Sequence, residues 1–128
     1  MLYQIAFAVH MIGLIGWGGL TTGAYYVLQW GKSDDSRLLL AYRKLVYVEI
    51  ASLVAMTVTG LFMWMELGFP SWVYPAFAMA PVLGVGELIH WRLTYVGDLA
   101  IFLRRMRYLS AFYTVIALLL IYDMVFKP

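Results

Sequence analysis

Four long apolar stretches, separated by short polar segments, make up most of the chain. The first extends over residues 2–31 without one Asp, Glu, Lys or Arg. About 20 apolar residues are enough for a helix to cross a bilayer. We therefore predict helices at about residues 2–30, 38–66, 72–103 and 104–126. This pattern predicts an all-α protein, a four-transmembrane-helix up-and-down bundle that forms a single integral membrane domain over residues 1–128.

The segments between these stretches carry turn and breaker residues. A polar turn at residues 31–36 ends the first helix, and Gly68, Pro70 and Pro75 separate the second helix from the third. We expect Pro81 to kink the third helix rather than end it, because neighbouring helices can satisfy the freed backbone groups. The connections are short, so little of the chain is left outside the membrane.

Composition supports the membrane interpretation and narrows the chemistry. Hydrophobic residues make up 64% of the chain and charged residues 12%, which an ordinary soluble domain does not have. The chain has no cysteine, so we exclude disulfides, iron–sulfur clusters and covalent c-type haem. The first stretch lacks a basic start and a cleavage site, so we expect it to be retained as a helix. Membrane lipid is the expected surrounding, and we expect no nucleic-acid partner.

Positive charges are concentrated in two of the three connections. Around the first connection are Lys32, Arg37, Arg43 and Lys44, around the third are Arg92, Arg104, Arg105 and Arg107, and the second has none. We expect the protein in the cell's inner (plasma) membrane. The positive-inside rule then places both basic connections on the cytoplasmic side and both termini on the outer side. Arg104 and its neighbours most simply set topology and bind anionic lipid, and they are also candidates for pairing with the propionates of a porphyrin.

His10 lies within the first uncharged stretch, where an ionisable side chain is costly unless it has a partner. His10, Gly13 and Trp17 fall on one helix face, and a glycine one turn from a histidine opens space for a flat macrocycle. We therefore predict that His10 is a ligand of haem b iron. The glycines also allow a second interpretation, since small residues such as the Gly19-x-x-x-Gly23 pair let membrane helices pack closely.

His90 has a similar setting, with Gly86 one turn before it and Glu87 three residues before it. We predict it as the second candidate iron ligand. A structural alternative is a hydrogen bond from His90 to Glu87 or Glu49 near the headgroups. Glu87-x-x-His90 with Glu49 is half of the carboxylate-bridged di-iron pattern, so a proton relay or a quinone contact is the simpler prediction for this group.

The depths of the two histidines differ. His10 is ~12 Å below the start of its helix and His90 is ~25 Å below a start near residue 73. One iron then reaches both only if the third helix begins near Pro81. Otherwise Met79 or Met56 lies at the level of His10, and a His/Met pair is an accepted haem ligation.

With these features the chain resembles the bacterial HemJ-type protoporphyrinogen oxidases and the related CopD-like membrane domains. The resemblance rests on residues 10–19 (HMIGLIGWGG), Thr59-Gly60-Leu61, a third helix ending at His90, Arg107-Tyr108, and the closing residues 125–128. It implies a small helical membrane protein that handles tetrapyrroles, with His10 as its first-helix histidine. The family's lysine after the third-helix Trp is missing after Trp72, which favours tetrapyrrole binding over oxidase activity.

The leading expectation from the sequence is a membrane protein that binds haem b through His10 and transfers electrons within the bilayer. It would act alone, as a homo-oligomer or as a small subunit of a larger respiratory complex, with a quinone or porphyrin as small-molecule partner. The alternatives are a HemJ-like tetrapyrrole oxidase and a cofactor-free structural or assembly subunit.

Overall fold

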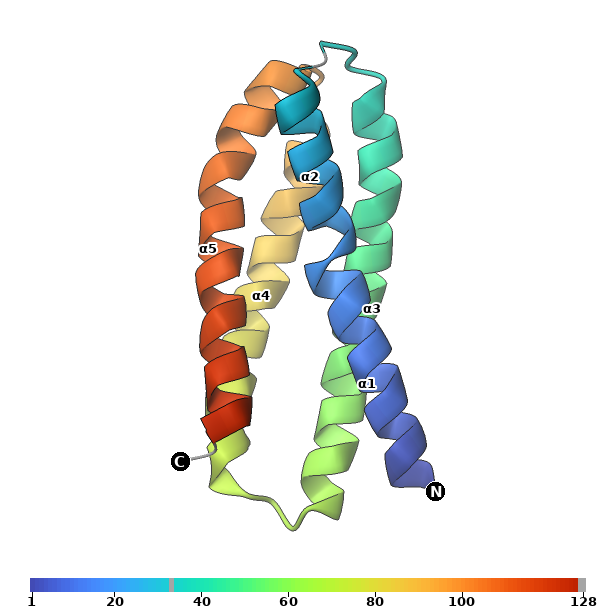
Figure 1. The fold of residues 1–128 in the computed structure, drawn as a ribbon, viewed down its shortest axis with the longest axis vertical. Helices are drawn as coiled ribbons and strands as arrows, with labels where there is room; N and C mark the ends of the chain where they lie inside the picture. Colours follow the sequence, from blue (N-terminus) through green and yellow to red (C-terminus); the bar gives the residue numbers. More distant parts are fainter. Residues whose placement is uncertain (33, 127–128) are drawn as a thin grey trace.

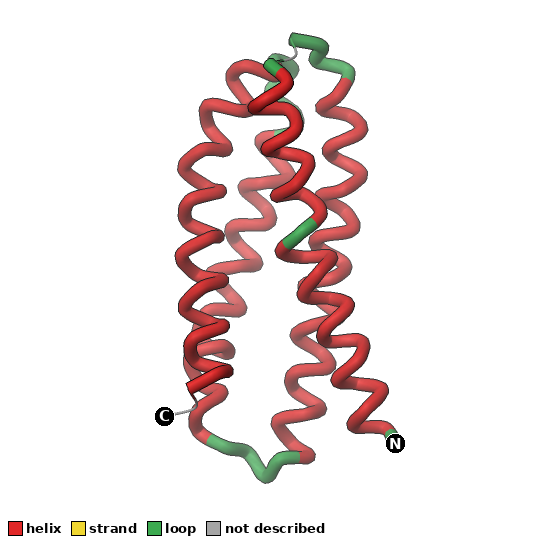
Figure 2. Tube along the Cα trace, in the orientation of Figure 1, coloured by secondary structure: helices red, strands yellow, loops and turns green. Residues whose placement is uncertain are grey.

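The computed structural model describes residues 1–32 and 34–126. Ser33, Lys127 and Pro128 lie outside the described residues, and the last two of these belong to the closing motif of the resemblance. The described residues contain helices and connecting turns but no strand (Figures 1 and 2). The helices are α1 (Leu2–Gly18), α2 (Leu20–Gly31), α3 (Leu38–Glu66), the short 3-10 helix η1 (Ser71–Val73), α4 (Tyr74–Leu93) and α5 (Leu99–Phe126).

Four helical segments are long and apolar enough to cross a membrane: α1 with α2, α3, η1 with α4, and α5. They confirm the predicted all-α four-helix bundle and make the chain a multi-pass membrane protein. Large apolar side chains such as Ile12, Val58 and Leu118 are exposed on the outside of the bundle, where lipid would cover them. Both termini lie at one end with the α3–η1 turn, here called the terminal end (Figure 1). The α2–α3 and α4–α5 connections lie at the opposite end, here called the charged end.

The boundaries of the first, third and fourth predicted helices need correction, whereas α3 has the predicted bounds. Gly19, with φ −108° and ψ −43°, divides the first span into α1 and α2. The prediction that the third helix continues to residue 103 was wrong, because α4 ends at Leu93. Gly97 turns the chain at φ +78°, and the Asp98 side chain accepts the backbone N–H of Ala100 at 2.8 Å, which is an N-cap interaction. Arg104 therefore lies within α5 and not between helices.

Glycines bring α1 close to α3. A Cβ atom at Gly13 would lie 2.6 Å from Met56 Cγ and 3.1 Å from the Ser52 carbonyl oxygen. A Cβ atom at Gly16 would collide with the Ser52 hydroxyl. The predicted packing pair Gly19-x-x-x-Gly23 is not the one used here, because a Cβ at Gly23 would have no neighbour within 4 Å. The space that we expected at Gly13 for a macrocycle is filled by α3.

Two apolar clusters surround the middle of the bundle. The inner cluster lies toward the charged end and includes Tyr25, Tyr42, Val46 and Phe102. The outer cluster is formed by Trp17, Leu83 and Ile116, with partly buried side chains packed around it. The polar groups described below lie between the two clusters, so the packing holds them in a region with little access to water.

Arg43 joins α3 to the end of α4. Its guanidinium donates to the hydroxyl oxygen of Thr94 at 3.1 Å and to the Thr94 carbonyl at 2.9 Å, and it lies 3.6 Å from the centre of the Tyr95 ring. A cation at a helix C-terminus stabilises the unpaired carbonyls there. Arg43 therefore has a structural role that the topology rule alone did not predict.

We expect Arg43→Ala to lower the free energy of unfolding by about 1–2 kcal/mol, because charge-assisted hydrogen bonds and a cation–π contact are lost together. Lys44→Ala is the matched control, since Lys44 is the next cation along α3 and is exposed. The measurement is thermal unfolding of the detergent-solubilised variants by circular dichroism. Equal melting temperatures for the two variants would contradict the role of Arg43.

Candidate intramembrane metal centre

Four buried polar side chains meet between α3 and α4. Tyr42 and Glu49 are seven residues apart on α3, which places them two turns apart on one face. Glu87 and His90 are three residues apart on α4 and share the facing side. Each of the four side chains belongs to a residue that is at most 2% exposed. The two helix periodicities therefore bring two carboxylates, an imidazole and a phenol into one place.

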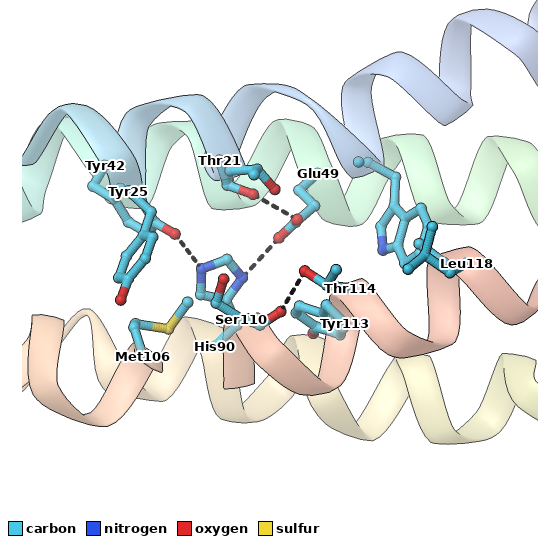
Figure 3. A pocket seen from close by; sticks show the side chains of 14 residues that line it. Thr21, Tyr25, Tyr42, Glu49, His90, Met106, Ser110, Tyr113, Thr114 and Leu118 are labelled. Atoms are coloured by element: carbon cyan, nitrogen blue, oxygen red, sulfur yellow. Dashed lines mark hydrogen bonds and ion pairs between the residues drawn. The ribbon is translucent and has the colours of Figure 1, made fainter. Parts of the chain in front are cut away.

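His90 is the centre of this group (Figure 3). Its Nδ1 lies 2.7 Å from Glu49 Oε2. The same nitrogen lies 3.6 Å from Glu87 Oε2, which the figure does not draw. On the other side of the ring, Nε2 lies 2.6 Å from the Tyr42 hydroxyl. The Thr21 hydroxyl on α2 donates to Glu49 Oε1 at 2.6 Å. The imidazole is thus hydrogen-bonded at Nε2 and faces the carboxylates with Nδ1, and one glutamate is oriented from a third helix.

Several oxygens of this group have no hydrogen-bond donor within the described residues. Both oxygens of Glu87 are buried and accept no well-aligned hydrogen bond, although Oε2 lies 3.6 Å from His90 Nδ1. Glu49 Oε2 and His90 Nδ1 are close to each other, but their orientation does not make a hydrogen bond. A buried polar atom without a partner costs about 1–3 kcal/mol, and more if it is charged. These atoms belong to ligand groups that lie within 4.8 Å of one another, and a cation bound among them would satisfy them.

The distances suit a single metal ion. One ligand atom from each of Glu49, Glu87 and His90 can be chosen so that all three lie within 4.8 Å of one another. Two ligands of a tetrahedral zinc ion, each ~2.0–2.1 Å from the metal, are ~3.4 Å apart. Shifts of less than ~1 Å would therefore bring the three atoms to bonding distance. A second Glu-x-x-His motif is absent from the sequence, so these residues provide for one ion and not for a di-iron pair.

The charges also balance for a divalent ion. Two ionised glutamates and a neutral histidine carry a charge of −2, which one divalent cation would neutralise. Without a cation, two protons shared among the two carboxyls and the imidazole would also make the cluster neutral overall. Either state avoids an isolated charge in the apolar interior, where ionised groups are strongly disfavoured.

A cavity of about 220 Å³ adjoins the cluster. Glu49, His90, Tyr42 and Tyr113 line it (Figure 3). Trp17 also forms part of its wall. The cavity would allow a small molecule or water to reach the side of the cluster that the protein leaves open. Its volume is below the ~300–1,000 Å³ of typical pockets for drug-sized ligands, so it cannot enclose a haem.

The structure places His10 apart from His90. The His10 Nδ1 lies 3.0 Å from both the Met56 carbonyl oxygen and Thr59 Oγ1. Those partners are on average about 12 residues farther along α3 than Tyr42 and Glu49, a separation of ~18 Å. The two histidines therefore do not share one iron within a chain. A haem held by both of them does not fit this bundle.

The other predicted site residues have different surroundings. Trp17 is buried and lines the cavity, and its ring meets Tyr113 edge-on at a centroid distance of 6.2 Å. Gly86 is packed against Tyr113, because a Cβ there would lie 2.9 Å from the Tyr113 hydroxyl. Met79 packs against the outer cluster, and Arg104 is exposed on α5. None of these four residues places a ligand atom at the Glu49, Glu87 and His90 cluster.

Sequence reasoning missed Tyr42, Thr21 and Tyr113 as members of the site. The spacing of seven between Tyr42 and Glu49 was the available signal for one of them. Asp123 was also missed, although it is only 7% exposed within an apolar helix. No family model, curated protein or solved structure matches the chain.

Proposed function

We propose that this chain is an integral membrane metalloprotein that holds one divalent first-row transition-metal ion through Glu49, Glu87 and His90. The observation that carries the proposal is the convergence of three buried ligand groups whose facing oxygens have no donor among the described residues. Ionisable groups at this depth are costly and are usually retained for function.

The donor set indicates the class of ion. One imidazole nitrogen with carboxylate oxygens suits zinc, iron(II) or manganese(II), and the absence of thiolates disfavours copper(I). Such an ion would supply Lewis-acid chemistry or, if it is redox-active, electron transfer. Tyr42 would orient the imidazole by accepting a hydrogen bond from Nε2–H while Nδ1 faces the ion, as partners of metal-bound histidines commonly do.

Cobalt(II) titration of the metal-stripped, detergent-purified protein tests this proposal. We expect saturation at one ion per chain, with visible absorption bands from the bound cobalt. His90→Ala is expected to abolish saturable binding, and Tyr42→Phe to weaken it about 10–100-fold, as loss of a partner of a ligating histidine does. Glu66→Gln is the control, because Glu66 is an exposed carboxylate at the end of α3. Equal cobalt binding by wild type and His90→Ala would refute the proposal.

A second candidate function, electron transfer through haem b at His10, is favoured by one specific observation. Thr59 Oγ1 already donates to the Ala55 carbonyl at 2.7 Å, so the His10 Nδ1–H is the donor toward Met56 and Thr59. This leaves Nε2 with the free lone pair, the usual state of a ligating histidine. The second ligand would be Met56 or Met79, or it would come from outside this chain, for example His10 of another copy.

The reduced-minus-oxidised visible spectrum of the purified protein tests this second candidate. We expect a b-type α-band in wild type and in His90→Ala, and its loss in His10→Ala. A band that disappears in both variants would show that the two histidines act together and would contradict the separation described above. A wild-type spectrum without the band would remove the haem candidate and leave the Glu49, Glu87 and His90 centre unaffected.

We also propose the inner membrane as the location, with both termini outside. Lys32, Arg37 and Arg43 lie at the same end of the bundle as Arg92, which supports a single cytoplasmic face for these charges.

A further inference from the structure

We infer that the cavity beside Glu49, Glu87 and His90 binds the ring head of a lipid-soluble quinone that enters sideways from the bilayer. The inference rests on the proposed metal centre, since Glu49 and His90, two of its proposed ligands, line the cavity. Three features of the cavity favour such a ligand: its volume, the unpaired Trp17 donor in its wall and the position of its mouth.

The volume suits a single substituted ring. An engineered apolar cavity of ~150 Å³ is large enough to bind benzene. The cavity here has about 220 Å³, which leaves room for ring substituents but not for a fused macrocycle. An aromatic wall formed by Trp17, Tyr25 and Tyr113 also favours a flat ring, because aromatic side chains stack or pack edge-on against one.

One hydrogen-bond donor in the wall has no acceptor within the described residues. Trp17 is 3% exposed, and its Nε1–H finds no partner there. The Tyr113 hydroxyl is also buried in the wall, beside the Glu87 carboxylate. An indole N–H can only donate, so its partner must be an acceptor such as a carbonyl oxygen. A quinone carries two carbonyl oxygens on opposite sides of one ring, and an alkane tail carries none.

The mouth of the cavity faces lipid. The residues of its wall that are exposed are Gly18 and Thr22 on the first span and Thr114 and Leu118 on α5. They lie along membrane-spanning helices and not in the charged connections. The mouth is thus level with the interruption at Gly19, where α1 and α2 meet. A ligand with an apolar tail could place its ring inside and leave the tail among the acyl chains.

Isothermal titration calorimetry with a 1,4-benzoquinone carrying a decyl tail tests the inference. The cobalt-loaded protein in detergent is titrated, and the heat of partition into empty micelles is subtracted. We expect saturation at one quinone per chain. Leu118→Trp should weaken binding at least tenfold by narrowing the mouth, whereas Leu119→Trp should leave it unchanged. Leu119 is the matched control, because it is the next residue on α5, is similarly exposed and does not line the cavity.

Trp17→Phe probes the donor inside the cavity. Because one hydrogen bond is lost, we expect binding about 3–10-fold weaker. Heats that do not saturate, or equal affinities for Leu118→Trp and Leu119→Trp, would overturn the inference. Displacement of the quinone by n-decanol at similar concentrations would also overturn it, by showing a site for acyl chains.

The cobalt and quinone titrations test the metal centre and the quinone site independently. Saturable cobalt binding without saturable quinone binding overturns only the quinone site. The opposite result, quinone binding by a protein that takes up no cobalt, overturns only the metal centre.

Discussion

His90→Leu is expected to lower the free energy of unfolding by about 3–5 kcal/mol, the typical cost of removing one partner from a buried charged group. In wild type the imidazole lies between the carboxylates of Glu49 and Glu87 on one side and the Tyr42 hydroxyl on the other. Without it, two glutamates remain buried with no basic group beside them. The measurement is unfolding of the metal-free, detergent-solubilised protein by sodium dodecyl sulfate, followed by circular dichroism.

A triple variant shows whether the loss comes from the stranded carboxylates or from the missing ring volume. Glu49→Leu, Glu87→Leu and His90→Leu combined should recover most of the stability, since replacing a buried ionic group by apolar residues of similar size is often neutral or stabilising. The triple variant should bind no cobalt. If its stability is as low as that of His90→Leu, packing and not charge explains the loss, and the electrostatic account of the cluster is wrong.

Gly13→Leu is expected to lower the free energy of unfolding by about 3 kcal/mol. The added side chain would meet Met56 Cγ and the Ser52 carbonyl, and a backbone atom cannot move away as a side-chain end can. Overpacking of a tight interface costs about 1–3 kcal/mol and occasionally more. The same unfolding measurement applies, with gel filtration to detect aggregated protein.

Gly23→Leu is the matched control for Gly13→Leu. It makes the same substitution in the other half of the first span, where a Cβ would have no neighbour within 4 Å. Leucine favours a helix over glycine by about 0.5–1 kcal/mol, so stability should be unchanged or slightly higher. A large loss of stability at Gly23 would imply that this face meets a partner, such as a second copy of the chain.

The number of spans and the bounds of α3 could be predicted from the sequence, because apolar length alone determines them. The start of α5 was missed for a local reason. Gly97 and Asp98 are turn and N-cap residues, but they lie within an apolar pattern that continues on both sides. The interruption at Gly19 was missed because Gly18 and Gly19 are equally compatible with a continuous, closely packed helix.

The grouping of Glu49, Glu87 and His90 was predicted as one of several alternatives, because helix periodicity places Glu87 beside His90. The pairing of His90 with Tyr42 depends on the axial register between α3 and α4, and the periodicity of each helix does not determine that register. The role of Gly13 required the identity of its neighbour. The sequence shows only that a small residue is there, and either a cofactor or a helix could take the space.

The depth of the cluster has an electrical consequence. Glu49 lies one and a half turns beyond Lys44, which is ~8 Å along α3, or about a quarter of a ~30 Å hydrocarbon layer. A divalent cation that reached Glu49 from the charged end would cross that fraction of the membrane potential. At about 2.3 kcal/mol per charge per 100 mV, the potential would change its binding free energy by about 1 kcal/mol per 100 mV. The fraction of chains that hold a metal ion would then depend on the membrane potential as well as on the metal concentration.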